Sequence, residues 1–250
     1  MPTVVRQMTM EASMPDVDGP SGYGEVARRA QQVKERIAAA CRRAGRTPAD
    51  VNLIAVSKGH PPEAVRAVHE AGVTFFGENR VQEASQKIPL CPSTLIWHMV
   101  GHLQRNKVRK ALPLFEMVHS VDSVPLMEVL ERECSRLGKV MPVLVEVNVA
   151  GESSKYGVAP ENLRELLDAA AGCGHLEVRG LMTMPPWSPD PEKVRPYFAR
   201  LRELLVQAGE KWGHCLVELS MGMSADFEVA IEEGATMVRI GTAVFGRRPQ

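Results

Sequence analysis

A lysine directly follows the first long apolar run of the chain. Residues 51–57 have the nearly continuous apolar composition of a parallel strand buried on both faces, and Lys58 comes next. Partial dehydration lowers the pKa of a lysine, and the neutral amine is then a nucleophile that can form a Schiff base. The position alone also fits a surface lysine whose stem lies along apolar neighbours and whose ammonium reaches water.

Two short glycine-containing turns near the end of the chain have the composition of an anion site. In the turn SMGMS (220–224), Gly222 allows close backbone approach, and Ser224 is expected to cap the following helix. Gly241 and Thr242 are expected to begin a short helical turn. Each turn alone could be a simple strand-to-helix connection, but helix N-termini also attract anions. Both turns together, after the last two strands of a barrel pattern, favour a phosphate site.

Polar residues at other strand ends are further candidates. Arg239 shares strand parity with Gly241, so its side chain is expected to point toward the mouth of the barrel. There its guanidinium could donate to a ring nitrogen or a carboxylate, or form an ion pair with Glu146. Asn79 could orient a ligand oxygen or cap the next helix. Glu146 and Asn148 share one face of an apolar strand, and Asn148, nearer the strand end, is the better ligand candidate.

Two histidines, His98 and His102, lie four residues apart. They would share a face if this stretch were helical, but no third ligand follows, so a metal site is not expected. A basic segment comes after them, made up of Arg105, Lys107, Arg109 and Lys110. It is most simply a solvated helix face, with a small groove for an anionic partner as the alternative.

The elements that must position these residues alternate between strand and helix. The strand-like segments are 51–57, 74–77, 95–101, 116–122, 143–149, 176–184, 215–220 and 236–242. Eight strand-helix units predict a single (β/α)8 TIM barrel, in which an extra N-terminal helix over 23–44 covers the gap left by the missing last helix. A doubly wound open sheet is the alternative, weakened because no GxGxxG follows the first strand. Residues 1–22 are expected to be a mobile tail and residues 23–250 the barrel domain.

The composition of the chain excludes several classes of protein but does not indicate a particular function. Lys+Arg and Asp+Glu number 30 each, so the bulk charge favours neither nucleic acid nor an anionic membrane as partner. The chain has no apolar run of membrane-helix length, and its first 22 residues lack the apolar core of a secretory signal. Five cysteines, an odd number without a CxxC motif, are typical of reduced thiols in a cytoplasmic protein.

An amine at the first strand and a phosphate cradle at the last two strands are together what pyridoxal 5′-phosphate (PLP) requires. The segments AVSKGHPPEAV, FFGENRVQEA, WHMVGHLQRNK, NVAGESSKYG and LSMGMSADFEVAIEEGATMVRIGTAVFG carry a specific resemblance. In order along residues 51–247, they resemble the YggS/PROSC family of PLP-binding, or PLP homeostasis, proteins.

The resemblance implies a single barrel like the N-terminal domain of alanine racemase, with residue roles that carry over by position. Lys58 would form the Schiff base with PLP, Arg239 would face the pyridine nitrogen, and Asn79 would line the pocket. The phosphate would be held by Gly222, Ser224, Gly241 and Thr242. Ser220 and Met221 are further candidate contacts.

The expected function is non-catalytic binding of PLP in intracellular PLP homeostasis, by storage or delivery and by limiting free aldehyde. An arginine at the pyridine nitrogen keeps it unprotonated and weakens the ring as an electron sink. Racemases of this fold add a tyrosine base from a C-terminal β-domain, for which this sequence leaves only eight residues after Thr242. A one-domain amino-acid racemase and a cofactor-free Schiff-base aldolase are the alternatives. A monomer that meets PLP-dependent apoenzymes transiently is expected.

Overall fold

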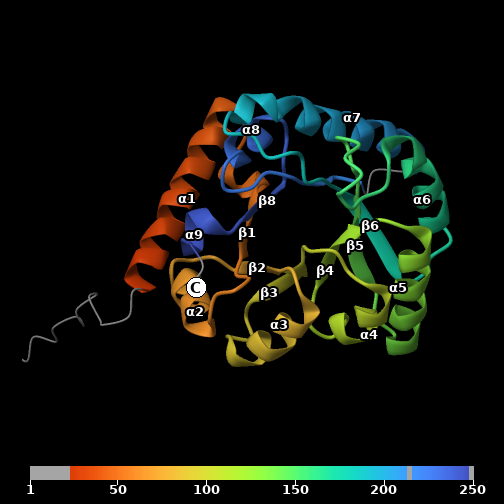
Figure 1. Ribbon diagram of the computed structural model, residues 1–250, viewed down its shortest axis with the longest axis horizontal. Coiled ribbons are helices and arrows are strands. Elements are labelled where there is room, and N and C mark those ends of the chain that lie inside the picture. The colour runs from red at the N-terminus through yellow and green to blue at the C-terminus, as the bar shows by residue number, and fades with distance from the viewer. Residues whose placement is uncertain (1–22, 213–215, 248–250) are drawn as a thin grey trace, which may run out of the picture.

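Eight parallel strands close into a barrel in chain order, as the sequence predicts. The computed structural model describes residues 23–212 and 216–247, so the expected tail over 1–22 lies outside the described residues. Each strand pairs with the next, and β1 pairs with β8 to close the sheet (Figure 1). The strands are β1 (Asn52–Val56), β2 (Phe75–Glu78), β3 (Ile96–Met99), β4 (Met117–Val121), β5 (Met141–Glu146), β6 (Leu176–Met182), β7 (Glu218–Ser220) and β8 (Met237–Ile240).

Helices surround the sheet and follow the strands in alternation (Figure 1). They are α1 (Tyr23–Arg43), α2 (Pro62–Glu70), α3 (Val81–Lys87), α4 (Val108–Ala111), α5 (Val124–Leu137), α6 (Leu163–Ala170), α7 (Arg195–Trp212), α8 (Phe227–Glu232) and α9 (Thr242–Phe245). A 3₁₀ turn, η3 (Arg105–Lys107), precedes α4. Within residues 23–212 and 216–247, none of the helices combines the length and apolar composition needed to cross a membrane.

The strands are apolar on both faces because each face packs against a different core. The outward side chains pack against the helices, as Leu53 and Ala55 of β1 do. The inward side chains, such as Ile54 and Val56, fill the barrel together with residues from other strands, which is the layered interior of this fold. Ile54 and Val56 thus lie on the same, inward face of β1, as strand parity predicts.

Helix α1 closes the outer ring beside the short α9, as predicted. Its apolar stripe is fully or nearly fully buried, and the helix contacts α2, α8 and α9 (Figure 1). Two arginines of α1 also reach α8: Arg36 Nη2 lies 3.0 Å from Glu228 Oε2, and Arg43 Nε lies 2.8 Å from Glu232 Oε1. These exposed pairs contribute little, so burial of the stripe stabilises this contact.

The strand limits differ from the predicted ones by a few residues. The largest differences are in β5, which begins two residues earlier and ends at Glu146, and in β7, which is confined to Glu218–Ser220. After β5 the chain pairs Val147 with Val158 in an isolated bridge, so the apolar run continues beyond the end of the ladder. The predicted start of the seventh strand at Cys215 lies outside the described residues.

Candidate functional site

One cavity at the carboxyl ends of the strands gathers most of the residues singled out by the sequence. It has a volume of about 320 Å³. Its lining includes Lys58, Asn79, Ser224, Arg239, Gly241 and Thr242. The other three predicted residues, Ser220, Met221 and Gly222, are buried beside this cavity and are not among its lining. The carboxyl end of a parallel barrel is where βα loops build binding sites.

Lys58 enters this cavity from the end of β1. It is half-buried and shares the cavity with Val56 and Val100, which are apolar, and with the guanidinium of Arg239. Ser57 before it is fully buried, and Gly59 after it has φ +75°, a conformation that favours glycine. The chain therefore turns sharply at Lys58 and leaves its amine at the edge of an apolar surface.

The turns after β7 and β8 lie side by side and are joined by a hydrogen bond. The backbone N–H of Ala243 donates to Ser224 Oγ at 3.1 Å. The prediction that Ser224 caps the following helix is wrong, because α8 begins at Phe227 with Asp226 as its N-cap. The Asp226 carboxylate accepts from the N–H of Met223 at 2.6 Å, and this closes the turn two residues beyond Ser224. Ser224 thus links the two turns.

Gly222 allows the β7 turn to pack against α8. Its φ is +93°, and a Cβ at this position would lie 2.6 Å from Ala230 Cβ. The Gly222 carbonyl accepts from the N–H of Arg239 at 2.9 Å, which ties the turn to β8. Met221, in contrast, is fully buried in the core outside the barrel, so the structure places it behind the turn. The close backbone approach that Gly222 predicts is therefore an approach to helix α8.

Arg239 is buried with its guanidinium held by two neighbours. Nη1 donates to Ser220 Oγ at 2.6 Å, and Nη2 donates to the carbonyl of Thr183 at 2.8 Å. Burial lowers its pKa to about 10, against the opposing charges of Glu146 and Asp226, so it stays charged at neutral pH. Arg239 therefore bonds to Ser220 and Thr183, and it does not form the predicted alternative, an ion pair with Glu146.

A chain of polar side chains runs from Arg239 into the barrel. His119 Nδ1 lies 2.9 Å from Ser220 Oγ, and His119 Nε2 lies 2.9 Å from His98 Nδ1. Burial lowers the pKa of His98 to about 4 and that of His119 well below its usual value, so both rings are neutral. Sequence reasoning missed His119, whose only signal was a histidine inside an apolar strand.

The two histidines four residues apart do not share a site. His98 points into the barrel, whereas the ring of His102 stacks on Tyr156 with centroids 3.8 Å apart. The stretch between them is not helical, because β3 ends at Met99 and η3 begins only at Arg105. Among the described residues, no group of three or more His, Cys, Asp or Glu is arranged to hold a metal ion.

Glu146 is a buried carboxyl near Arg239 and should make stability depend on pH. Burial raises its pKa to about 7, although Arg239 opposes this shift. The folded protein then holds a proton that the unfolded chain releases, so this group's contribution is complete below pH 4.5 and declines as pH rises to 7. Relative to Glu146→Gln, the wild type should lose up to about 3 kcal/mol over this range. Urea unfolding of both proteins at a series of pH values measures the difference. His98 and His119 also make stability depend on pH, but they do so in both proteins, so the difference in stability isolates Glu146. A difference that does not change with pH would contradict the prediction.

Asn79 lies between the Lys58 cavity and a second cavity of about 580 Å³ at the same end of the barrel. Its Oδ1 is buried without a hydrogen-bond partner among the described residues, and it does not cap α3, whose N-cap is Arg80. Asn148, expected to reach a ligand, instead donates from Nδ2 to the carbonyl of Glu152 at 2.9 Å and holds its own loop. Asn79 is therefore the asparagine that remains available at the site.

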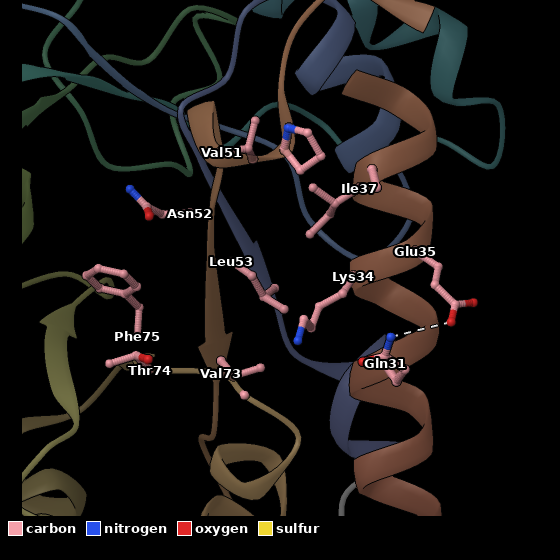
Figure 2. Close-up of a pocket in the computed structure, with 13 residues that line it drawn as sticks. Gln31, Lys34, Glu35, Ile37, Val51, Asn52, Leu53, Val73, Thr74 and Phe75 are labelled. Atoms are coloured by element: carbon pink, nitrogen blue, oxygen red, sulfur yellow. Dashed lines mark hydrogen bonds between the residues drawn. The ribbon is translucent and has the colours of Figure 1, made fainter. Parts of the chain in front are cut away.

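A further cavity, of about 440 Å³, lies at the opposite end of the barrel, between α1 and the first residues of β1 and β2 (Figure 2). Lys34 donates to the carbonyl of Ala71 at 3.0 Å, and Gln31 donates to Glu35 at 3.5 Å. None of the predicted site residues lines it. The Lys58 cavity is therefore the candidate site.

Fold and cavity together define the class of protein: a closed parallel barrel with a lysine after its first strand and paired glycine turns after its last two. The sequence profile of the alanine racemase N-terminal domain family matches residues 29–249. A protein of Aquifex aeolicus named pyridoxal phosphate homeostasis protein is 47% identical over 221 residues, which cover 88% of this chain and 97% of that protein. A Pseudomonas aeruginosa protein of the same name is 44% identical over 89% of this chain and 96% of its own length. The chain belongs to the pyridoxal phosphate homeostasis protein family.

A solved structure is similar to this chain in both sequence and fold. PipY of Synechococcus elongatus, determined with PLP bound, is 36% identical and superimposes with a TM-score of 0.77. The match covers 88% of this chain and all of PipY. The predicted family and barrel are thus confirmed.

Proposed function

We propose that this chain holds PLP through Lys58 and serves PLP homeostasis by storing or delivering the cofactor and by limiting free aldehyde. The observation that carries the proposal is the single cavity that combines Lys58, Arg239 and the two glycine turns. PLP supplies an aldehyde that condenses with an amine and a phosphate that needs an anion site. The names of the relatives and the PLP bound to PipY support the same function.

The residues present fit the chemical groups of this cofactor. Lys58 offers the amine. Asn79 Oδ1, which has no hydrogen-bond partner in the part of the chain that the structure describes, offers an acceptor. Ser224, Gly241 and Thr242 line the cavity where the two joined turns meet, and we assign the phosphate to them and to the adjacent Gly222. Ser220 would act through Arg239, to which it is bonded, and Met221 would support the turn from the core.

Arg239 would restrain the chemistry of a bound pyridine ring. A guanidinium with a pKa of about 10 keeps its protons at neutral pH, so it can donate a hydrogen bond to a ring nitrogen without protonating it. The bonds to Ser220 and Thr183 hold it in place. An unprotonated ring withdraws fewer electrons, which favours holding the cofactor over turnover of amino acids.

The positions of the tyrosines also favour a carrier. The three tyrosines of the chain are Tyr23 on α1, Tyr156 after β5 and Tyr197 on α7. None of them lines the Lys58 cavity, and Tyr156 lies against His102. A racemase needs a second base opposite the lysine, and none of these tyrosines is placed to be that base.

Absorption spectroscopy with borohydride trapping tests the proposal. The purified protein incubated with PLP should turn yellow, and borohydride should bleach it and add one reduced PLP group to the peptide that contains Lys58. Alanine and serine incubated with the holoprotein in D₂O should gain no deuterium at Cα. Deuterium uptake would indicate the racemase alternative, and a colourless protein that traps a phosphosugar would indicate the aldolase.

We further propose that the protein works in the cytoplasm as a monomer, with residues 23–250 as one domain and with transient contacts to PLP-dependent apoenzymes. The cysteines that the structure describes support a location in a reducing compartment, because they form no disulfide with one another. They are Cys41, Cys91, Cys134 and Cys173. Burial raises the pKa of each of these thiols, so they are poor nucleophiles. Sedimentation at rising protein concentration, with and without PLP, tests the oligomeric state.

A further inference from the structure

A buried lysine other than Lys58 lies behind the end of β1. Lys87, the last residue of α3, is only 6% exposed, yet its Nζ is bonded in three directions. Its Nζ donates to the carbonyl of Ser57 at 2.7 Å, to Glu78 Oε1 at 2.6 Å and to Glu83 Oε1 at 2.7 Å. An ammonium has three N–H donors, so all the donors of Lys87 are used.

The carboxylates of Glu78 and Glu83 also bind the residues on both sides of Lys58. Ser57 Oγ donates to Glu78 Oε1 at 2.6 Å, and the N–H of Gly59 donates to Glu83 Oε1 at 2.6 Å. Ser57 is therefore held by its carbonyl and its hydroxyl, and Gly59 is held by its N–H. The side chains of three residues from β2 and α3 thus hold the residues before and after Lys58, while none of the three lines the Lys58 cavity.

The burial of Glu78 and Lys87 costs free energy of folding, and the fold alone does not require it. Glu78 is fully buried, burial raises its pKa against the pull of Lys87, and its Oε2 has no partner among the described residues. Well-packed apolar side chains of similar volume often stabilise a core as well as or better than a buried ion pair. The location of the charges directly beside Lys58 points to a role at the site.

We propose that Lys87, Glu78 and Glu83 are positioning residues for Lys58. They fix the backbone at Ser57 and Gly59, so the Lys58 amine is presented to the cavity in one orientation. The inference rests on the proposed function of Lys58 as the amine that takes PLP. Orientation of reacting groups accounts for a large part of the rate of such condensations, and small displacements are costly.

Glu83 offers the sharpest test, because its side chain, at 30% exposed, is the least buried of the three and its removal still leaves Lys87 paired with Glu78. In Glu83→Ala the amide of Gly59 loses its acceptor, and its hydrogen exchange in the apoprotein should become faster. The rate of PLP uptake at Lys58, followed by absorbance after mixing, should fall about 10-fold. The visible circular dichroism of the bound cofactor should change as well. Lys87→Met is less informative, since it leaves Glu78 buried without its cation.

Two matched variants separate positioning from a general loss of stability. In Glu83→Gln the amide oxygen can still accept from Gly59 and Lys87, so the exchange and uptake rates should return to within about 2-fold of wild type. Glu63→Ala removes a carboxylate that pairs with Arg66 on the exposed face of α2, and it should change neither rate. Thermal unfolding of each apoprotein measures the stability effect separately.

The possible failures are distinguishable. If the wild-type protein takes up no PLP at Lys58, the proposed function is overturned, and the positioning role with it. If the wild type takes up PLP at Lys58 but Glu83→Ala does so at an unchanged rate, the positioning role alone is overturned. Equal slowing by Glu83→Ala and Glu83→Gln would also overturn it, because the hydrogen bond to Gly59 would then not be the cause.

Discussion

Lys58→Ala is expected to abolish covalent retention of PLP. The variant should stay colourless after incubation with PLP and gel filtration, and borohydride should add no mass to any peptide. Without the Schiff base, the apparent affinity for PLP should fall on the order of 100-fold, leaving only the phosphate and ring contacts. Lys58 is half-buried at a strand end, so the melting temperature of the apoprotein should barely change. Absorbance titration and differential scanning calorimetry measure both effects.

Lys34→Ala is the matched control for this experiment. Lys34 is also half-buried and also lines a cavity (Figure 2). That cavity is lined by the first residues of β1 and β2, at the opposite end of the barrel. This variant should bind PLP as the wild type does. A yellow Lys58→Ala protein whose colour is lost instead in another lysine variant would show that the Schiff base forms elsewhere.

Gly222→Ala should have the largest effect on the fold among substitutions at the site. An alanine there would have φ +93° and a Cβ 2.6 Å from Ala230 Cβ and 2.9 Å from Phe227 Cα, so α8 or the turn must move. The backbone strain and the overpacking together should lower the free energy of unfolding by about 2–5 kcal/mol. Displacement of the turn should also move Ser224 and weaken PLP binding more than 10-fold. Urea unfolding and PLP titration measure the two losses.

Gly45→Ala isolates the backbone part of this effect. Gly45 has φ +66°, but no atom of the described residues lies within 4 Å of the position that its Cβ would take. Its substitution should cost only about 1–2 kcal/mol and leave PLP binding intact. Equal losses of stability in both variants would mean that the α8 contact does not constrain Gly222.

Local patterns were enough to predict the barrel and much of the site. Continuous apolar runs alternating with amphipathic helices indicate parallel strands buried on both faces, and β1 through β8 follow that pattern. Lys58 and Arg239 were assigned to the same end of the barrel because each comes at the carboxyl end of its predicted strand, and both line one cavity. Strand limits were less predictable, as in β5, because the ladder ends where the neighbouring strand ends and not where the apolar run does.

Hydrogen bonds between segments that lie far apart in the chain were not predictable. Ser224 was predicted to cap the helix that follows its own turn, whereas its Oγ accepts from the backbone N–H of Ala243 in the next turn. His98 and His119 meet inside the barrel from adjacent strands, although 21 positions separate them in the chain. Nothing local marks either histidine as a partner of the other, since each lies singly in an apolar run.

The sequence by itself determined the strand-helix alternation, the end of the barrel at which chemistry can occur and the amine that reaches it, because period, parity and glycine placement are local properties of the chain. Only the tertiary structure decided what holds the residues on either side of that lysine. Lys87, Glu78 and Glu83 form their contacts to Ser57 and Gly59 across 21 to 30 positions. Such contacts form only when β2 and α3 pack beside β1, and the parallel pairing of β1 with β2 brings them there.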